Sequence, residues 1–379
     1  MKRIYVENIS ERDLVESPFL VRSKTTAMAK NGKPYLTLKL MDKTGEVEGR
    51  VWDRVDEFSS RFDKDDFIHV RAKASVYMGK MQLIVQDLRR VEDTEVEIGD
   101  FLPVSEQAVG DMIAQLRSMI ESMENRHLKA LMEAFLDDEQ FLAMFSRAPA
   151  AKGMHHAYLG GLLEHSLAVA SLAHDISGRY ADIDRDLLIT GALLHDVGKV
   201  AELCYDRGFD YTDAGKLLGH IVMGVEMVDD KIRSLPDFPV QLKTLVKHLL
   251  LSHHGQYDYG SPKRPKTLEA VVLNFVDDLD SKINGVSSHI AKEASNPESW
   301  TSYHRLYDRY FFKGTAAGQD ETGSNLRDLP QPPEKKDERT SKEKGEGKTD
   351  RRGRSGFTLA DQLNGKSLDL FSEKNERRD

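Results

Sequence analysis

Apolar and polar residues alternate through much of the first 95 residues, which predicts β-strands. The alternation is strict over residues 35–41 and 70–77, and it returns over residues 46–52. Turn-forming residues separate these runs at Asn31-Gly32, Thr44-Gly45 and Met78-Gly79-Lys80. The inward-facing set is Leu36, Leu38, Leu40, Val47, Val51, Val70, Ala72, Ala74 and Val76. Five short strands with one helical stretch at residues 55–62 predict a small β-barrel.

Beyond residue 95 the spacing of apolar residues becomes helical. In residues 96–150, apolar side chains recur every three or four positions from Met112 to Met123 and again from Leu128 to Phe145. We interpret this stretch as a helical connector or as the first helices of the next domain. Residues 151–312 are predicted to be entirely helical, and Gly198 and Gly255 are each expected to close a helix in a left-handed cap.

The last part of the chain has a different composition. Residues 331–356 hold almost no apolar side chain and many charged ones, so residues 313–379 are expected to form a mostly disordered tail. A short docking helix at residues 357–371 is the alternative there. The expected fold class is therefore multidomain α+β. It comprises a five-stranded OB-type β-barrel at residues 1–95, the connector at 96–150, an all-α domain at 151–312 and the tail.

Bulk properties narrow the class of protein. The 379 residues carry a formal net charge of −9 and a single cysteine, Cys204, which excludes an internal disulfide and a cysteine-built zinc site. No apolar run approaches the ~18 residues of a membrane span, and the N-terminus lacks the apolar core of a signal peptide. We therefore expect a cytoplasmic protein with no membrane partner, in which any contact with nucleic acid is a local groove.

Histidines and aspartates concentrate in the helical region, where nine of the 13 histidines lie between His155 and His254. A single histidine on an apolar helix face is more often a hydrogen-bonded core residue than a ligand, and we interpret His174, His248, His289 and His304 in this way. Imidazoles and carboxylates on separate helices of one domain instead predict a divalent metal site. The candidates are His165, His195, Asp196, His220, His253, His254 and Asp277.

Two segments carry a resemblance to a known superfamily. Leu193-Leu194-His195-Asp196-Val197-Gly198-Lys199 is similar to the central signature of the HD-domain metal-dependent phosphohydrolases, and Val276-Asp277-Asp278-Leu279-Asp280 to their closing aspartate motif. The resemblance covers residues 150–285. It implies His165, His195, Asp196 and Asp277 as ligands of a first ion. It implies a second ion at His220, His253 and His254, with Asp196 bridging the two.

The same resemblance implies that Lys199 faces a phosphate. His156 and its neighbour His155 precede the helix that carries His165, so their position predicts that they line the same cleft, either in contact with substrate as a catalytic residue or behind the ligands. Burial in the hydrophobic core is the alternative for both. The ligand types suit one or two ions of Mn²⁺, our first expectation, with Co²⁺, Fe²⁺, Ni²⁺ or Zn²⁺ as alternatives.

The outward face of the barrel is the candidate for binding nucleic acid. Its residues interleave cations with aromatic rings, as a single strand requires, because bases stack on rings and phosphates meet Lys or Arg. An ordinary solvated barrel face is the alternative. The set is Tyr35, Lys39, Arg50, Trp52, Arg71, Lys73 and Tyr77.

The order of barrel, connector, the segment Ala150 to Leu167 and the histidine–aspartate signature resembles the YhaM-type 3′→5′ exoribonucleases over residues 15–312. This resemblance implies a hydrolase that shortens single-stranded RNA from the 3′ end and releases nucleoside monophosphates, with single-stranded DNA as an alternative substrate. Two other functions stay open: an HD phosphohydrolase of free nucleotides with a regulatory barrel, and a non-enzymatic single-strand binding protein. Further copies of the chain, in a homo-oligomer, are the other partner considered.

Overall fold

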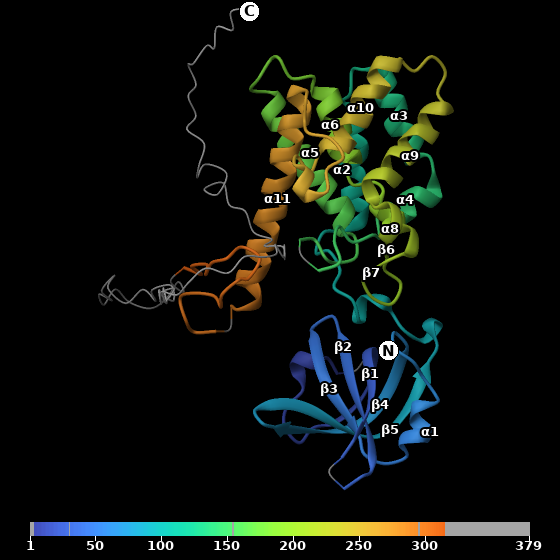
Figure 1. The fold of residues 1–379 in the computed structure, drawn as a ribbon, viewed down its shortest axis with the longest axis vertical. Coiled ribbons are helices and arrows are strands. Elements are labelled where there is room, and N and C mark those ends of the chain that lie inside the picture. Colours follow the sequence, from blue (N-terminus) through green and yellow to red (C-terminus); the bar gives the residue numbers. More distant parts are fainter. Residues whose placement is uncertain (1–3, 30, 154, 295, 315–379) are drawn as a thin grey trace, which may run out of the picture. The chain divides into compact units, whose positions relative to one another are not determined.

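The computed structural model describes residues 4–29, 31–153, 155–294 and 296–314 (Figure 1). The chain divides into two compact units, residues 1–285 and 286–379. The barrel and all candidate metal ligands, the last of which is Asp277, lie in the first unit. The disordered tail and the docking helix expected at residues 357–371 lie outside the described residues.

The N-terminal part is a closed barrel of five strands in the order β1-β2-β3-β5-β4. Its strands are β1 (Leu14–Met28), β2 (Pro34–Asp42), β3 (Gly45–Val51), β4 (Phe67–Tyr77) and β5 (Lys80–Val91). Strands β3 and β5 run parallel, whereas the other neighbours are antiparallel. The short helix α1 (Val55–Ser59) lies between β3 and β4 along the chain. This arrangement confirms the OB-type barrel and its helical insert.

The alternation along the strands sorts the side chains as expected, with one exception. Eight of the nine residues predicted to point inward are buried in the barrel core, but Val76 is 44% exposed. Val76 pairs with Met81 beside the β4–β5 turn, and the last buried residue of β4 is Ala74. The hairpin therefore extends past the core, and alternation alone does not mark where the barrel wall ends.

The helical part contains α2 (Val109–Glu121), α3 (Arg126–Leu136), α4 (Glu139–Phe145), α5 (Gly161–Ser177), α6 (Arg185–Leu194), α7 (Lys199–Glu202), α8 (Asp213–Leu218), α9 (His220–Arg233), α10 (Val240–Ser252) and α11 (Leu268–Lys292) (Figure 1). Side chains of Asn125, Asp138, Asp184 and Thr212 cap the first turns of α3, α4, α6 and α8. None of the described helices has the length and apolar character needed to cross a bilayer.

Helices α2 to α4 share one core with the helices that follow. Leu116 and Leu131, from α2 and α3, are buried in the same cluster as Leu163, Leu188 and Leu249. Helix α6 is central, because every residue from Asp186 to Leu194 is buried. Of the two interpretations of residues 96–150, these helices therefore support the first helices of the next domain.

The prediction that residues 151–312 are entirely helical is wrong in two places. A small hairpin pairs β6 (Leu203–Cys204) with β7 (Asp210–Tyr211). After α11, which ends at Lys292, isolated bridges join Trp300 to Phe312 and His304 to Arg309.

Gly198 was also assigned incorrectly. Gly255 has φ +76° and forms the left-handed turn expected of it, but Gly198 has φ −64° and ψ −17°. A Cβ on Gly198 would lie only 2.0 Å from the carbonyl oxygen of His220. This glycine is therefore required because α9 begins against it, and the close approach brings His220 next to the His195-Asp196 pair.

We expect Gly198→Ala to destabilise the protein by about 1–3 kcal/mol, because the added methyl forces two backbone segments apart. Gly110→Ala is the matched control, since a Cβ at this helical position meets nothing within 4 Å. The control should leave stability unchanged or raise it slightly, because alanine favours helix over glycine. Urea unfolding of both variants measures the difference, and equal stabilities would contradict the proposed clash.

Candidate metal centre and nucleic-acid face

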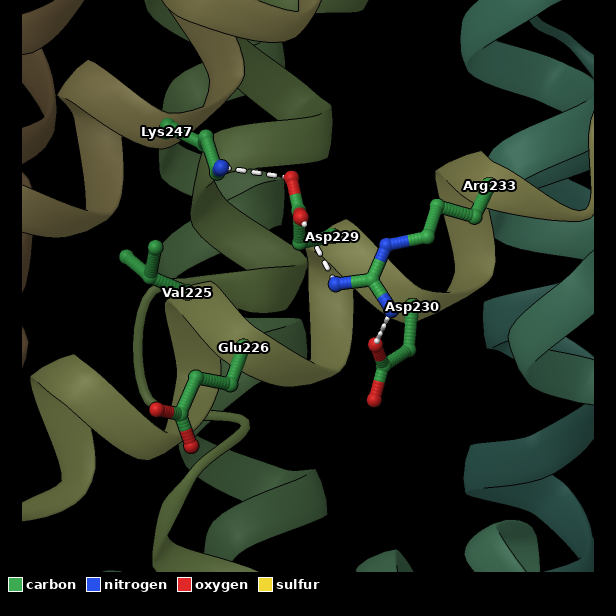
Figure 2. A pocket seen from close by; sticks show the side chains of 6 residues that line it. All are labelled: Val225, Glu226, Asp229, Asp230, Arg233 and Lys247. Carbon is green, nitrogen blue, oxygen red and sulfur yellow. Dashed lines mark hydrogen bonds and ion pairs between the residues drawn. The ribbon is translucent and has the colours of Figure 1, made fainter.

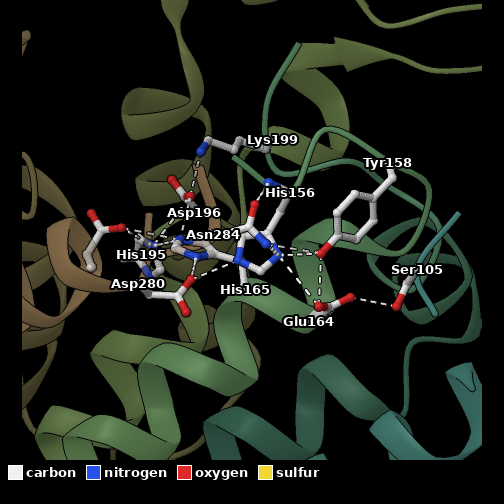
Figure 3. Close-up of polar contacts among 11 residues, drawn as sticks. Ser105, His156, Tyr158, Glu164, His165, His195, Asp196, Lys199, Asp280 and Asn284 are labelled. Carbon is white, nitrogen blue, oxygen red and sulfur yellow. Dashed lines mark hydrogen bonds and ion pairs between the residues drawn. The ribbon is translucent and has the colours of Figure 1, made fainter. Parts of the chain in front are cut away.

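Side-chain atoms of His165, His195, Asp196 and Asp277 converge within the helical part, and Figure 3 labels the first three. His165 Nε2 lies 3.2 Å from His195 Nε2, 3.2 Å from Asp277 Oδ1 and 3.6 Å from Asp196 Oδ2. His195 Nε2 lies 3.4 Å from Asp196 Oδ2 and 3.7 Å from Asp277 Oδ1. Ligand bonds of about 2.0–2.2 Å place neighbouring ligand atoms at about this separation, so the four atoms fit one divalent ion.

The other oxygen of Asp196 faces a second group of histidines. Asp196 Oδ1 lies 3.3 Å from His220 Nε2 and 3.6 Å from His253 Nε2. All three atoms are buried and, within the described part of the chain, have no hydrogen-bond partner. One ligand atom from each of His220, His253 and His254 lies within 4.8 Å of the others. Buried polar atoms without a partner are costly, and a second cation would satisfy them.

The histidine rings are oriented by their other nitrogen. Nδ1–H of His195, His253 and His254 donates to a backbone carbonyl, at Ala192, Leu250 and Tyr259 respectively, over 2.7–2.9 Å. For His165 and His220 the acceptor is a carboxylate instead: His165 Nδ1 contacts Asp280 at 2.7 Å, and His220 Nδ1 contacts Glu202 at 3.1 Å. Because these acceptors hold a proton on Nδ1, Nε2 is in each ring the nitrogen that faces the site and is available to an ion.

Electrostatics keep the carboxylates ionised. Burial raises the pKa of Asp196, but Lys199 and His195 outweigh it and hold the pKa well below its usual range. The pKa of Asp277 is lowered in the same way by His195 and His165 against burial. Burial lowers the pKa of His254 to about 4 and that of His155 to about 4. The site therefore offers charged oxygens and, at these two positions, neutral imidazoles.

Lys199 lies at this site. Its Nζ is 2.5 Å from Asp196 Oδ2, and burial lowers its pKa less than Asp196 raises it. The ammonium group thus stays charged beside Asp196, and its contact with a phosphate stays a prediction.

His156 is placed behind the ligands. Its side chain is 4% exposed, Nε2 lies 2.9 Å from Asp280 Oδ2 and Nδ1 lies 2.8 Å from the hydroxyl of Tyr158. Both nitrogens are occupied by protein groups, which favours the position behind the ligands, and contact of His156 with substrate stays a prediction.

The sequence did not assign a role to Asp280 or Glu202, each of which orients a ligand. Burial raises the pKa of Asp280, but hydrogen bonds from His156 and His165 lower it to about 2. The three-residue spacing from Asp277 to Asp280 was the available signal, since it places both on one face of α11. No comparable spacing marks Glu202.

A pocket of about 280 Å³ lies elsewhere, on α9 and α10 (Figure 2). Four of its charged residues are joined by ion pairs: Asp229 contacts Arg233 at 3.1 Å and Lys247 at 2.5 Å, and Asp230 contacts Arg233 at 2.8 Å. None of its lining residues is a candidate ligand, so we assign it no chemistry.

On the barrel, strands β2 and β3 bring four of the seven predicted contact residues together. The rings of Tyr35 and Trp52 are stacked, with centroids 4.7 Å apart, and Arg50 lies over Tyr35 at 5.3 Å. Lys39, on the same strand as Tyr35, pairs with Glu46 at 3.2 Å. Trp52 is 47% exposed. Because Tyr35 contacts Trp52 and Arg50, Trp52 is the ring of the pair best placed to receive a base.

The other three predicted residues, Arg71, Lys73 and Tyr77, lie on β4. This strand borders β1 and β5 and has no edge with β2 or β3. Arg71 is moreover opposite Glu16 on β1 and Asp87 on β5. The seven residues therefore do not form one continuous face, and we keep the β2–β3 group as the candidate surface.

Comparisons with known proteins agree with this division. The family model described as "HD domain" matches residues 162–282, and that described as "OB-fold nucleic acid binding domain" matches residues 20–91. A third model, TraI_2, matches residues 100–183.

Similar curated proteins cover both parts. The 3′-5′ exoribonuclease YhaM of Geobacillus sp. (strain WCH70) is 35% identical over 301 residues, which are 79% of this chain and 91% of that protein. The proteins of the same name from Bacillus velezensis and Bacillus subtilis (strain 168) are each 33% identical over 318 residues, 83% of this chain and 98% of theirs. With an OB-type barrel, an HD domain and this similarity across most of its length, the chain belongs to the YhaM family.

Proposed function

We propose that this chain is a metal-dependent phosphodiester hydrolase that shortens single-stranded RNA from its 3′ end and releases nucleoside monophosphates. The observation that supports it best is the buried Asp196 carboxylate, which turns one oxygen toward each of two groups of ligand atoms. The polarity and the preference for RNA follow from the names of the relatives. Single-stranded DNA is a second candidate substrate.

The candidate site residues would have the following roles. His165, His195, Asp196 and Asp277 would hold a first ion, and Asp196 with His220, His253 and His254 a second. Divalent ions in such a site polarise phosphodiester oxygens and make water a stronger nucleophile at neutral pH. Lys199 adds a fixed positive charge next to Asp196, where it can balance charge on a phosphate. We propose Mn²⁺ as the native ion, since imidazole with carboxylate suits it.

The barrel would supply affinity for the strand. With a net charge of −9, the chain as a whole does not attract RNA, so short-range contacts must do so. The Tyr35–Trp52 stack with its neighbouring Arg50 offers a base-stacking surface beside a cation. We also propose a cytoplasmic location, because a chain with one cysteine suits a reducing compartment.

The main test uses RNA labelled at its 5′ end, with Mn²⁺ added. We expect a ladder of products that shorten from the 3′ end, and we expect His195→Ala to lower the rate by more than about 100-fold, because even residues behind a ligand cost 10–100-fold. His248→Ala is the matched control, since His248 contacts the backbone N–H of Lys266 and belongs to neither ligand group.

Other outcomes point to other functions. Internal cuts would indicate an endonuclease, and hydrolysis of nucleoside triphosphates without RNA cleavage would favour a nucleotide phosphohydrolase. RNA binding that persists in His195→Ala, with no hydrolysis by the unaltered chain, would favour a non-enzymatic binding protein.

Ion binding should release a proton. Burial lowers the pKa of His165, but Asp277 and Asp280 outweigh it and raise the pKa to about 9. Without an ion the ring is therefore protonated near neutral pH, and that proton must leave before Nε2 can bind. The raised pKa stabilises the folded, ion-free chain fully below pH ~6.5, and this stabilisation is lost as the pH rises through the folded pKa of His165. Because the proton competes with the ion for His165, the affinity for the ion should rise with pH up to about 9. Calorimetric Mn²⁺ titrations in buffers of different ionisation enthalpy measure the released proton, and a buffer-independent heat would refute its release.

Trp52→Ala should weaken binding of single-stranded RNA by about 1–3 kcal/mol, the usual contribution of one stacked base. Lys73→Ala is the comparison, because Lys73 is an exposed cation on β4, away from β2 and β3. Its effect should be smaller and should shrink as salt is added. Fluorescence anisotropy of labelled RNA in a metal chelator measures binding without cleavage, and an equal or larger loss in Lys73→Ala would place the strand on β4 instead.

A further inference from the structure

A chain of hydrogen bonds leads away from the first group of ligands. Asp280 Oδ2 accepts from His165 Nδ1 at 2.7 Å and from His156 Nε2 at 2.9 Å (Figure 3). One carboxylate oxygen is thus shared between the candidate ligand His165 and His156, which belongs to neither of the two ion groups described above. His156, His165 and Asp280 lie close enough together to form a third such group, but the hydrogen bonds between them already occupy the facing atoms. The position of the shared oxygen fixes the direction of the His165 ring.

His156 is itself held tightly. Its backbone has φ +45°, a left-handed conformation that is uncommon for residues other than glycine. The backbone N–H donates to Asn284 Oδ1 at 2.8 Å. On the far side, the hydroxyl of Tyr158 bridges His156 Nδ1, at 2.8 Å, and Glu164 Oε1, at 2.9 Å.

The network ends outside the helices of the site. Glu164 Oε2 accepts from the hydroxyl of Ser105, whose backbone N–H donates to the carbonyl of Leu159. Each polar group from Ser105 to His165 therefore has a partner. The network is buried at His156, His165 and Asp280 and partly buried toward Ser105, and its connected hydrogen bonds restrict the arrangement of its members.

We propose that His156 is a positioning residue for the first ion: by fixing Asp280, it holds the His165 ring so that Nε2 points at the other three ligands. This inference rests on the proposed function, because it assumes that the first group binds an ion. Both ring nitrogens of His156 are engaged by protein groups, Tyr158 and Asp280. His156 acts through Asp280, and the affinity for the first ion depends on that contact.

Two substitutions of similar size separate this role from simple filling of space. The amide nitrogen of His156→Gln reaches the place of Nε2 and can still donate to Asp280. The amide of His156→Asn reaches only the place of Nδ1, so it retains Tyr158 and loses Asp280. A residue needed only for packing would tolerate both equally.

The experiment is a Mn²⁺ titration of the full chain and of both variants, followed by calorimetry or by the electron spin resonance of free Mn²⁺. We expect His156→Asn to weaken the first ion about 10–100-fold and His156→Gln to stay close to the unaltered chain, since loss of a residue behind a ligand has this effect. The second ion should bind equally to all three proteins. Hydrolysis of RNA by His156→Asn should recover when Mn²⁺ is raised to saturate the first site.

Equal affinities for the first ion in the two variants overturn the inference, whether both match the unaltered chain or both are weakened. Should His156→Asn fail to fold, Asp280→Asn replaces it, because a neutral amide keeps the shape and weakens the hold on His165. In that variant an unchanged first affinity overturns the inference. If the unaltered chain binds no Mn²⁺ at all, the proposed function fails as well, so the two failures are distinguishable.

Discussion

The Asp196 carboxylate is the group on which the arrangement of the helices depends. It is almost wholly buried, and each of its oxygens faces imidazole nitrogens from different segments. A buried charge of this kind is stable only where opposite charge or a cation meets it. Lys199 supplies part of that charge within one helical turn, and the convergence of α5, α6, α9, α10 and α11 on the same point supplies the remaining partners.

Helix ends do much of the positioning. His195 and His253 each follow directly on a helix, and each donates from Nδ1 to a carbonyl three residues earlier, at Ala192 and Leu250. Carbonyls in the last turn of a helix have no partner within that helix. The unsatisfied carbonyl thus selects the tautomer of the histidine and aims its Nε2. The same local device is used twice, once in each group of ligands.

The sequence was sufficient to predict features that depend on the order of neighbouring residues along the chain. Strand alternation identified the barrel core, and the pairs His195-Asp196 and His253-His254 identified ligands that the structure brings together. It was insufficient where the reason lies in tertiary contact. Gly198 is needed because the His220 carbonyl approaches it, and Asp280 matters because two rings from elsewhere in the chain meet there. Likewise, the alternation distinguishes residues that face the barrel core from residues that face solvent, but it does not reveal which strands are neighbours. It therefore could not show that β2 and β4 are separated in the barrel.

The two candidate sites share a chemical property that bears on specificity. Stacking on an aromatic ring is available to every base, and the phosphodiester that two ions would engage is the same in every nucleotide. Neither the Tyr35–Trp52 stack nor the histidine–aspartate cluster presents a pattern of donors and acceptors suited to reading a base edge. A hydrolase built from these two parts would therefore discriminate by whether a strand is single and has an accessible end, and only weakly by its sequence.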